Sequence, residues 1–388
     1  VMAKLGEVCD ILNGYAFKSN QYTTSGVRII RISNVQKGYI EDKSPVYYPC
    51  DDENVKKYEL KQNDLLISLT GNVGRTALLE EKFLPAALNQ RVSCIRLKES
   101  DKVLKTYLFH LLNSDYFEQQ CMKAAEGVAQ KNLSPKWLFE YKIPIYSIER
   151  QKEISNTLDK IDLLIILRKQ QLAKLDELVK AQFVEMFGDC KTNPKNWKTK
   201  ALEKIANVGS SKRVFVEELQ DNGIPFYRGT EIGALAEKKI VKPELFITEE
   251  HYKELCKATG KPQKGDLLMP SICPDGRIWI VDTDEPFYFK DGRVLWVHLT
   301  SSDYNSVFLL YTLKDRIMTD YASIASGTTF AELKIFALKK CRIFDVPLEL
   351  QNQFAAFVER VDQQKQTVQQ SLEKLELMKK ALMQEYFG

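Results

Sequence analysis

The chain has 388 residues, of which 44% are hydrophobic and 28% charged, with a formal net charge of +4 at pH 7. This length predicts two large domains, and the composition excludes a disordered or fibrous protein. Because no apolar run approaches the roughly 20 residues that span a bilayer, and the first residues lack a signal-peptide profile, we expect a cytoplasmic protein with no membrane association. The mild positive charge permits a polyanionic partner without requiring one.

The eight cysteines are scattered along the chain, and there are only three histidines. Structural zinc sites draw their ligands from close pairs such as C-x-x-C, and no such pair occurs. We therefore predict free thiols and no metal site.

Residues 1–148 combine short β-type runs with a helical stretch. The runs lie at 28–32, 65–69 and 92–97, and the helical stretch covers 103–125. This pattern predicts a mixed α/β (α+β) domain with a mostly antiparallel, strongly curved sheet.

Residues 149–188 are typical of one long helix. Apolar side chains recur at spacings of three and four, as at Ile154, Leu158, Ile161 and Ile165, which places them on one helical stripe. The segment contains no proline, and its first glycine is Gly188 at the end, a residue suited to a C-terminal cap. At about 1.5 Å per residue the helix is about 60 Å long, and its single apolar stripe requires a partner helix.

The second half of the chain repeats the first. A polar, turn-rich linker (189–197) opens a second domain, 189–348, with β-type runs at 266–269, 277–281 and 294–299 and a helical stretch at 303–322. Residues 349–388 then align with 149–188 without a gap, and 12 of the 40 aligned positions are identical. The domains themselves match weakly, at motifs such as Asp64-Leu65-Leu66 with Asp266-Leu267-Leu268.

The duplication has a geometric consequence. If both helices span the same gap between the domains, they run antiparallel, and the two domains lie at opposite ends of a pseudo-twofold helical spacer. DNA is the polymer most often read at a fixed separation, since half-sites repeat at about 34–36 Å per helical turn. The divergence between the two domains then indicates two different targets.

The order of these segments resembles the specificity subunit of type I restriction–modification systems over the whole chain. The resemblance rests on the duplicated helices, on Ile143-Pro144-Ile145 leading to Glu149 and Gln151, and on the stretch 223–232. The second copy departs from the proline-rich helix start, with Phe344-Asp345-Val346 at that place. The resemblance implies that each variable domain reads one half of a gapped DNA target. It also implies that the helices set the gap and dock two methyltransferase subunits, which restriction (helicase-nuclease) subunits join. S-adenosylmethionine, ATP and Mg²⁺ are then used by the partners, and this chain carries no cofactor.

Catalytic patterns are missing from the sequence. It contains neither the Asn/Asp-Pro-Pro-aromatic loop of amino-methyltransferases nor a P-loop. A nuclease-like arrangement of Asp275 with Glu332 and Lys334 has no counterpart in the first copy. We therefore predict a non-catalytic recognition subunit.

Sequence readout requires polar and cationic side chains on loops that reach base edges and phosphates. The shared arginines (Arg31/Arg228, Arg75/Arg277, Arg91/Arg293) fit either phosphate contacts or salt bridges of the scaffold. The candidates in the first domain are Lys18, Arg28, Arg31, Ser33, Asn34, Arg75, Gln90, Arg91, Lys131 and Asn132. Those in the second are Ser211, Lys212, Arg213, Arg228, Thr230, Arg277, Lys290, Arg293, Thr328 and Thr329.

The helices carry more apolar side chains than two helices can cover by pairing. Exposed apolar area of this kind indicates an interface, although burial against the reading domains is the alternative. A cytoplasmic coiled-coil adaptor with duplicated protein-binding domains is the competing function. The candidate partner-binding residues are Leu163, Leu164, Ile166, Leu167, Leu178, Phe357, Leu377 and Met383.

Overall fold

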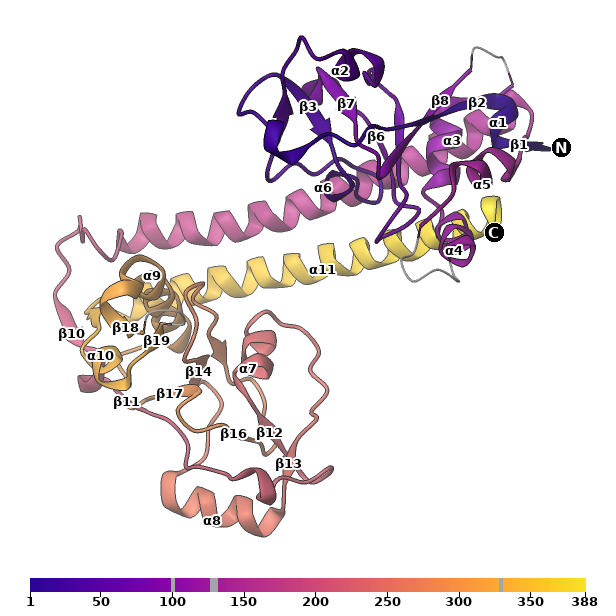
Figure 1. Ribbon diagram of the computed structural model, residues 1–388. Coiled ribbons are helices and arrows are strands. Elements are labelled where there is room, and N and C mark those ends of the chain that lie inside the picture. Colours follow the sequence, from indigo (N-terminus) through magenta and orange to yellow (C-terminus); the bar gives the residue numbers. More distant parts are fainter. Residues whose placement is uncertain (99–101, 126–131, 328–330) are drawn as a thin grey trace. The chain divides into compact units, whose positions relative to one another are not determined.

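The chain divides into two compact units, each containing one α/β domain and a part of both long helices (Figure 1). In the computed structural model, residues 1–98, 102–125, 132–327 and 331–388 are described. Unit 1 comprises Val1–Gln170 with Val368–Gly388, and unit 2 comprises Gln171–Thr367. Within the described ranges, no helix is both long enough and apolar enough to cross a membrane.

The domain of unit 1 contains two principal sheets instead of the one curved sheet expected. One has four strands in the order β2-β8-β5-β6 and is antiparallel throughout. The other has the order β4-β3-β7, in which β3 and β7 are parallel. Strand β1 pairs with β9 beside the long helix. The strands are β1 (Met2–Lys4), β2 (Cys9–Asn13), β3 (Val27–Ile30), β4 (Tyr47–Tyr48), β5 (Leu65–Ser68), β6 (Thr76–Leu78), β7 (Ala86–Leu88), β8 (Val92–Leu97) and β9 (Lys142–Pro144).

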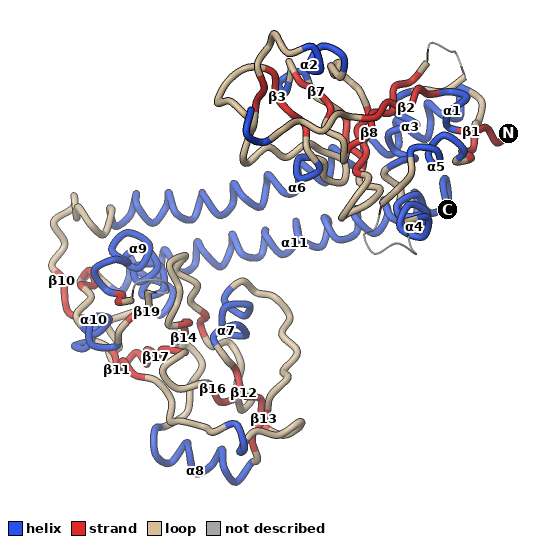
Figure 2. Tube along the Cα trace, viewed as in Figure 1, coloured by secondary structure: helices blue, strands red, loops and turns tan. Residues whose placement is uncertain are grey.

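The helices of this domain are short and lie beside its strands (Figure 2). The predicted helical stretch 103–125 is divided in two, because Ser114 caps a new helix by accepting a hydrogen bond from the backbone N–H of Phe117. The helices are α1 (Leu5–Val8), α2 (Glu53–Lys57), α3 (Lys105–Leu112), α4 (Asp115–Ala124) and α5 (Pro135–Glu140), with 3₁₀ turns η1 (Ser19–Gln21), η2 (Ile32–Asn34) and η3 (Glu81–Phe83).

The domain of unit 2 repeats this topology. Its four-stranded sheet has the order β11-β17-β14-β15, and its three-stranded sheet the order β13-β12-β16 with a parallel β12–β16 pair. A short hairpin, β18–β19, is added. The strands are β10 (Thr199–Ala201), β11 (Ala206–Gly209), β12 (Ile224–Tyr227), β13 (Phe246–Ile247), β14 (Leu267–Pro270), β15 (Trp279–Ile280), β16 (Tyr288–Phe289), β17 (Val294–Leu299), β18 (Ala325–Ser326), β19 (Glu332–Leu333) and β20 (Arg342–Phe344).

The helices of unit 2 differ more from their counterparts than the strands do. A helix of eight residues, α7, replaces the single turn η2, and α8, with 11 residues, takes the place of the five-residue α2. The helices are α7 (Gly229–Ala236), α8 (Glu249–Thr259), α9 (Ser306–Ile324) and α10 (Ile335–Lys339), with 3₁₀ turns η4 (Leu202–Lys204) and η5 (Val216–Glu218).

The long helices, α6 (Ile148–Phe187) and α11 (Leu348–Phe387), begin and end at equivalent positions of the repeat. They run antiparallel within each unit. In unit 1, Asp162 pairs with Lys379 at 2.5 Å and Lys169 with Glu376 at 3.0 Å. In unit 2, Asp176 pairs with Lys365 at 2.5 Å. The predicted antiparallel pair of helices is therefore confirmed.

The last turn of each long helix enters the core of the unit in which that helix ends. Phe187, at the end of α6, is fully buried in unit 2, with its ring centroid 4.8 Å from that of Phe308 and 5.5 Å from that of Phe354. Phe387, at the end of α11, packs in unit 1 at 5.6 Å from Tyr107. The shared Phe-Gly pair therefore completes a hydrophobic core in both copies.

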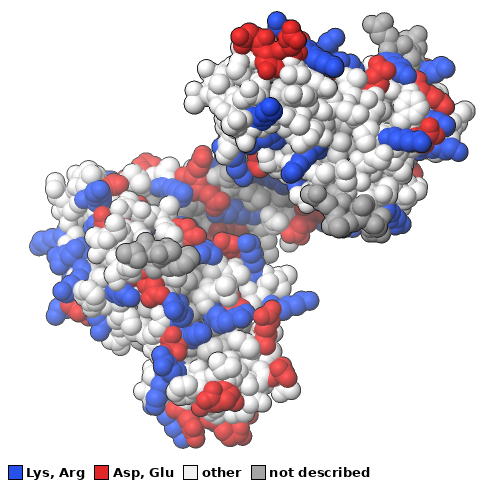
Figure 3. Space-filling view, in the orientation of Figure 1, with Lys and Arg blue, Asp and Glu red and all other residues white. Residues whose placement is uncertain are grey.

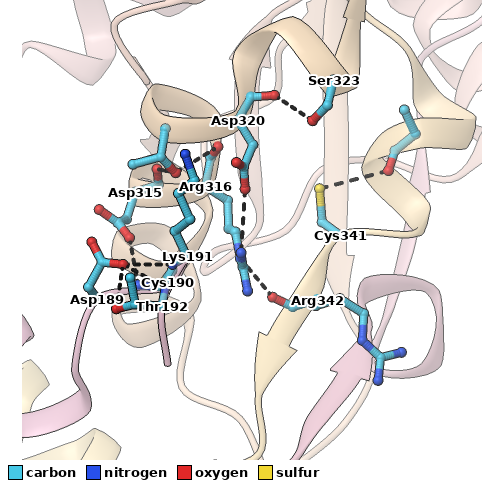
Figure 4. Close-up of polar contacts among 12 residues, drawn as sticks. Asp189, Cys190, Lys191, Thr192, Asp315, Arg316, Asp320, Ser323, Cys341 and Arg342 are labelled. Carbon is cyan, nitrogen blue, oxygen red and sulfur yellow. Dashed lines mark hydrogen bonds and ion pairs between the residues drawn. The ribbon is translucent and has the colours of Figure 1, made fainter. Parts of the chain in front are cut away.

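The linker after α6 is fixed to unit 2 by hydrogen bonds (Figure 4). The carboxylate of Asp189 accepts hydrogen bonds from the backbone of Lys191 and Thr192, and those bonds lower its pKa. The backbone N–H of Cys190 donates to Asp315 on α9 at 3.2 Å. This segment is thus an ordered turn that is hydrogen-bonded to the second domain.

Candidate nucleic-acid interface

Three loops meet at the same place in both units, which we call the loop junction. In unit 1 it comprises residues 69–75, 89–91 and 132–134. The backbone N–H of Leu69 donates to the carbonyl of Arg91 at 3.0 Å, and that of Leu133 donates to the carbonyl of Leu69 at 2.7 Å. Loops held together in this way present side chains from distant parts of the sequence on one surface.

Unit 2 has the same junction at residues 271–277, 291–293 and 331–334. The N–H of Ser271 donates to the carbonyl of Arg293 at 2.8 Å, and that of Leu333 donates to the carbonyl of Ser271 at 2.7 Å. Because both hydrogen bonds recur at equivalent positions, the loop junction belongs to the shared scaffold. Most of the side chains on it differ, whereas the arginines of the pairs Arg75/Arg277 and Arg91/Arg293 are shared.

Several predicted DNA-binding residues are brought together at the junction of unit 1. Arg75, Gln90, Arg91 and Asn132 all lie on its loops, and the last three are exposed. The guanidinium of Arg75 donates to Gln36 at 2.6 Å, which joins the segment carrying Arg31 and exposed Ser33 to the same surface.

A subset of the predicted cations is exposed and has no ion pair among the described residues. These are the side chains available for phosphate, since no carboxylate in the described part of the chain pairs with them. They are Lys18 and Arg91 in unit 1, and Lys212 and Lys290 in unit 2. Figure 3 shows lysines and arginines interspersed with acidic residues over the visible face.

The remaining shared arginines are engaged within their own domains. In unit 2, Arg277 pairs with Asp275 at 2.8 Å and Arg293 pairs with Glu332. The guanidinium of Arg31 donates to the carbonyl of Ser44 at 2.7 Å. Exposed Arg213 pairs with Asp291 at 3.2 Å.

Arg228 belongs to a capping arrangement at the start of α7. Its guanidinium pairs with Glu231 at 2.5 Å and with Glu244 at 3.0 Å. Burial acts to raise the pKa of Glu231, but hydrogen bonds from the side chain and backbone of Arg228 outweigh it and lower that pKa to about 2. The hydroxyl of Thr230 also donates to Glu231, at 2.9 Å.

Two predicted residues of unit 1 have scaffold roles instead. Asn34 is buried and takes the place of Glu231, since its Oδ1 accepts a hydrogen bond from the backbone of Arg31 at 2.8 Å. The guanidinium of Arg28 pairs with buried Asp42. Neither side chain is free to reach a base edge. In unit 2, the half-buried Ser211 hydroxyl donates to the carbonyl of Phe289.

Lys131, Thr328 and Thr329 lie outside the described residues. Sequence reasoning overlooked Thr70 and exposed Asn72, although Thr70 bridges to Asn132 at the junction. Both follow directly after the strand that carries the repeated Asp-Leu-Leu motif, and this position is the sequence feature that could have identified them as junction residues.

Most of the predicted partner-binding residues on the long helices are exposed. Their side chains have exposed fractions of 42% to 69%. They are Leu163, Leu164, Ile166, Leu167, Leu178 and Leu377.

Two members of that prediction are less exposed than expected. Met383 is only 8% exposed and lies in the core of unit 1. Phe357 is half-buried against the core of unit 2. Both face the domain that packs on their end of α11, the alternative that the sequence left open. Val184 and Met378, which were not predicted, are exposed.

The described residues contain no group of three or more His, Cys, Asp or Glu side chains that could hold a metal ion. The eight cysteines all lie in described segments and are free thiols. The loop junction offers hydrogen-bond donors, amides and cations, a set suited to recognition by contact.

The family model described as "Type I restriction modification DNA specificity domain" matches residues 1–177 and again 194–377. The chain belongs to this family. The double match also coincides with the duplicated topology, so the resemblance noted from the sequence is confirmed.

Relatives and solved structures agree with this membership. The "Type I restriction enzyme MjaVIII specificity subunit" of Methanocaldococcus jannaschii is 32% identical over 186 residues, which cover 46% of this chain and 43% of that protein. The "Putative type I restriction enzyme MjaX specificity subunit" of the same organism is 23% identical over 98% of this chain and 91% of its own. The chain thus spans less than half the length of the first of these relatives.

Two solved structures have the same fold. The type I restriction–modification S subunit from M. genitalium has a TM-score of 0.56 at 15% identity and covers 100% of this chain and 96% of its own. A chain from "Structural basis underlying complex assembly and conformational transition of the type I R-M system" has a TM-score of 0.62 at 18% identity and covers 100% and 97%.

Proposed function

We propose that this chain is the sequence-specific DNA-binding subunit of a type I restriction–modification complex and that it reads a bipartite, gapped target. The observation that carries the proposal is the loop junction, which recurs in each unit with the same backbone hydrogen bonds but with mostly different side chains. A shared scaffold with divergent contact residues is what recognition of two unlike half-sites requires. We assign the target-recognition domains to residues 1–148 and 189–348, and the spacer helices to 149–188 and 349–388.

Within each domain, side chains take one of two roles. Exposed cations without an ion pair, such as Arg91 and Lys290, contact phosphates, which bind any sequence and fix the register on the duplex. Exposed amides, such as those of Gln90 and Asn132, contact base edges, where donor and acceptor patterns differ between base pairs. Arginines already paired with carboxylates hold the loops in place.

The exposed leucines and isoleucine of the helices dock two methyltransferase subunits, with restriction subunits joining that assembly. Leu163, Leu164 and Leu167 are exposed and lie three or four residues apart or side by side on α6, and an exposed apolar patch of this kind indicates an interaction site. In this proposal S-adenosylmethionine, ATP and Mg²⁺ are bound by the partner subunits, and the chain contributes recognition.

The test is to co-express the full chain with its methyltransferase partner and to map adenine methylation in the host genome by single-molecule sequencing. We expect one bipartite motif with a fixed gap. Replacing residues 189–348 by the corresponding domain of another family member is expected to change one half of the motif and preserve the other. A stable complex that methylates no defined motif would contradict the proposal and favour a protein-binding adaptor.

A further inference from the structure

Each long helix carries a fully buried glutamine in its first turn. Gln151 of α6 and Gln351 of α11 occupy equivalent positions of the repeat, and both are 0% exposed. A buried amide that lacks hydrogen-bond partners is costly, so the partners of these two side chains show what the residue does.

The side chain of Gln151 is hydrogen-bonded to two segments of the first domain. Its Oε1 accepts a hydrogen bond from the backbone N–H of Leu104 at 2.8 Å. Its Nε2 donates to the carbonyl of Lys102 at 2.8 Å and to the carbonyl of Tyr146 at 2.9 Å. One amide therefore connects the helix, the segment that leads into α3, and the segment that leaves β9.

Gln351 makes the same three contacts in unit 2. Its Oε1 accepts a hydrogen bond from the N–H of Asn305 at 2.9 Å, and its Nε2 donates to the carbonyls of Asp303 and Val346 at 3.0 and 2.8 Å. The sequences around these partners differ between the copies, whereas the glutamine and its hydrogen-bond pattern are the same. Each domain is therefore held to its helix by the same three hydrogen bonds of one buried glutamine, an arrangement that we call the joint.

Glutamine suits this joint for a chemical reason. The joint presents one N–H and two carbonyl oxygens, and an amide supplies one acceptor and two donors. A carboxylate would place negative charge against two carbonyl oxygens, and a thioether would satisfy none of the three groups.

We propose that Gln151 and Gln351 are positioning residues that fix the direction in which each target-recognition domain leaves its spacer helix. They thereby set the gap that the chain accepts between half-sites. The inference rests on the proposed function, because a gap exists only if each domain reads a half-site. A loose joint lets a domain turn on its helix, so gaps of other lengths are bound, while the contacts within each half-site are unchanged.

The chain offers a matched control one turn further along α6. Ser155 is 2% exposed, and its hydroxyl has no hydrogen-bond partner among the described residues. The equivalent position of α11 is Ala355. Ser155→Ala thus removes a buried polar atom from the same helix without opening the joint.

The experiment compares the full chain with its Gln151→Met, Gln351→Met and Ser155→Ala variants, each assembled with the methyltransferase partner. The DNA is a set of duplexes that carry both half-sites at gaps varied by single base pairs. For the glutamine variants we expect selectivity for the native gap to fall about tenfold, as for the loss of one or two net hydrogen bonds. Affinity for an isolated half-site and the behaviour of Ser155→Ala should match the wild type.

Hydrogen exchange at the amides of Leu104 and Asn305 in the full chain is the second readout. This measurement needs no DNA. We expect faster exchange only at the amide that donates its hydrogen bond to the substituted glutamine, Leu104 for Gln151 and Asn305 for Gln351. If a methionine variant fails to fold, Gln151→Asn replaces it, because asparagine keeps the amide but is one methylene shorter. Folded variants that retain the native gap preference overturn the positioning role. A wild-type chain with no bipartite target contradicts the proposed function instead. In that case, an exchange rate at the Leu104 amide that is the same in the Gln151 variant and the wild type overturns the role of Gln151 in holding the domain to its helix.

Discussion

Phe187→Ala tests whether the end of α6 completes the core of unit 2. The phenylalanine ring is fully buried and contacts the rings of Phe183, Phe308 and Phe354 at centroid distances of 4.8–5.5 Å. The indole N–H of Trp197 also donates to its carbonyl at 3.0 Å, a bond that survives the substitution. The variant therefore isolates the contribution of the ring.

Truncation of a buried phenylalanine destabilises a domain by about 3–5 kcal/mol, as the sum of lost transfer energy and the cavity left behind. Edge-to-face contacts with neighbouring rings favour the upper part of this range. For a unit of this size, each kcal/mol lowers the melting temperature by about 2–4 °C. We expect the transition of unit 2 to fall by about 10 °C.

The measurement combines differential scanning calorimetry with hydrogen exchange, which assigns each transition to a unit. The amides of β14 and β17 should lose protection, while those of β5 and β8 in unit 1 should keep it. Val184→Ala, one turn earlier on the same helix and 48% exposed, is the control and should change stability by about 0.5 kcal/mol or less. A loss below about 1 kcal/mol for Phe187→Ala, or an equal loss in both units, would refute the role assigned to this residue.

Three further predictions follow from the site. Arg91→Ala should weaken DNA binding to a similar extent for all sequences and reduce the slope of log K, the binding constant, against log salt concentration by about one unit. Binding titrations at several salt concentrations measure both effects, and a loss of affinity confined to one base position would mean base readout instead. Leu163→Glu combined with Leu167→Glu should abolish co-purification of the methyltransferase. The melting temperature should stay within about 2 °C of the wild type, because both side chains are exposed. A variant that still co-purifies with the methyltransferase excludes this patch as the docking surface. Because the pKa of Glu231 is lowered from 4.5 to about 2, its contribution to stability is present above pH 4.5 and is lost as the pH falls towards 2. In Glu231→Gln, the loss of unfolding free energy on acidification should be smaller than in the wild type by about 1–2 kcal/mol. Urea melts at several pH values measure this loss, and an equal loss in both proteins would contradict the prediction.

The long helices were predictable because a 40-residue stripe of apolar side chains repeats without a gap. Strands that carry a shared motif, such as β5 and β14, were located within one or two residues. The division into two sheets was not predictable, since β3 pairs with β7 across more than 50 residues and β7 (Ala86–Leu88) has no alternating pattern. Its three residues are all buried, so period-two polarity is absent.

The roles of the basic residues depended on partners that the sequence does not reveal. Arg91 and Arg293 align, but among the described residues only Arg293 faces a carboxylate, that of Glu332 on β19. The burial of Met383 was not predictable for a related reason, because helical periodicity shows which residues share a face and not which domain covers that face. Contacts between segments distant in the chain decide both questions.

The placement of Phe387 in unit 1 has a consequence for synthesis on the ribosome. Unit 1 consists of Val1–Gln170 and Val368–Gly388, so about 200 residues must be translated after its first part before its core can close. At ordinary elongation rates of 5–20 residues per second this takes about 10–40 s. During that interval the side of Tyr107 that Phe387 later covers is open to chaperones or to the same segment of another nascent chain. The order of translation is thus the reverse of the order of completion: the domain made first is finished last.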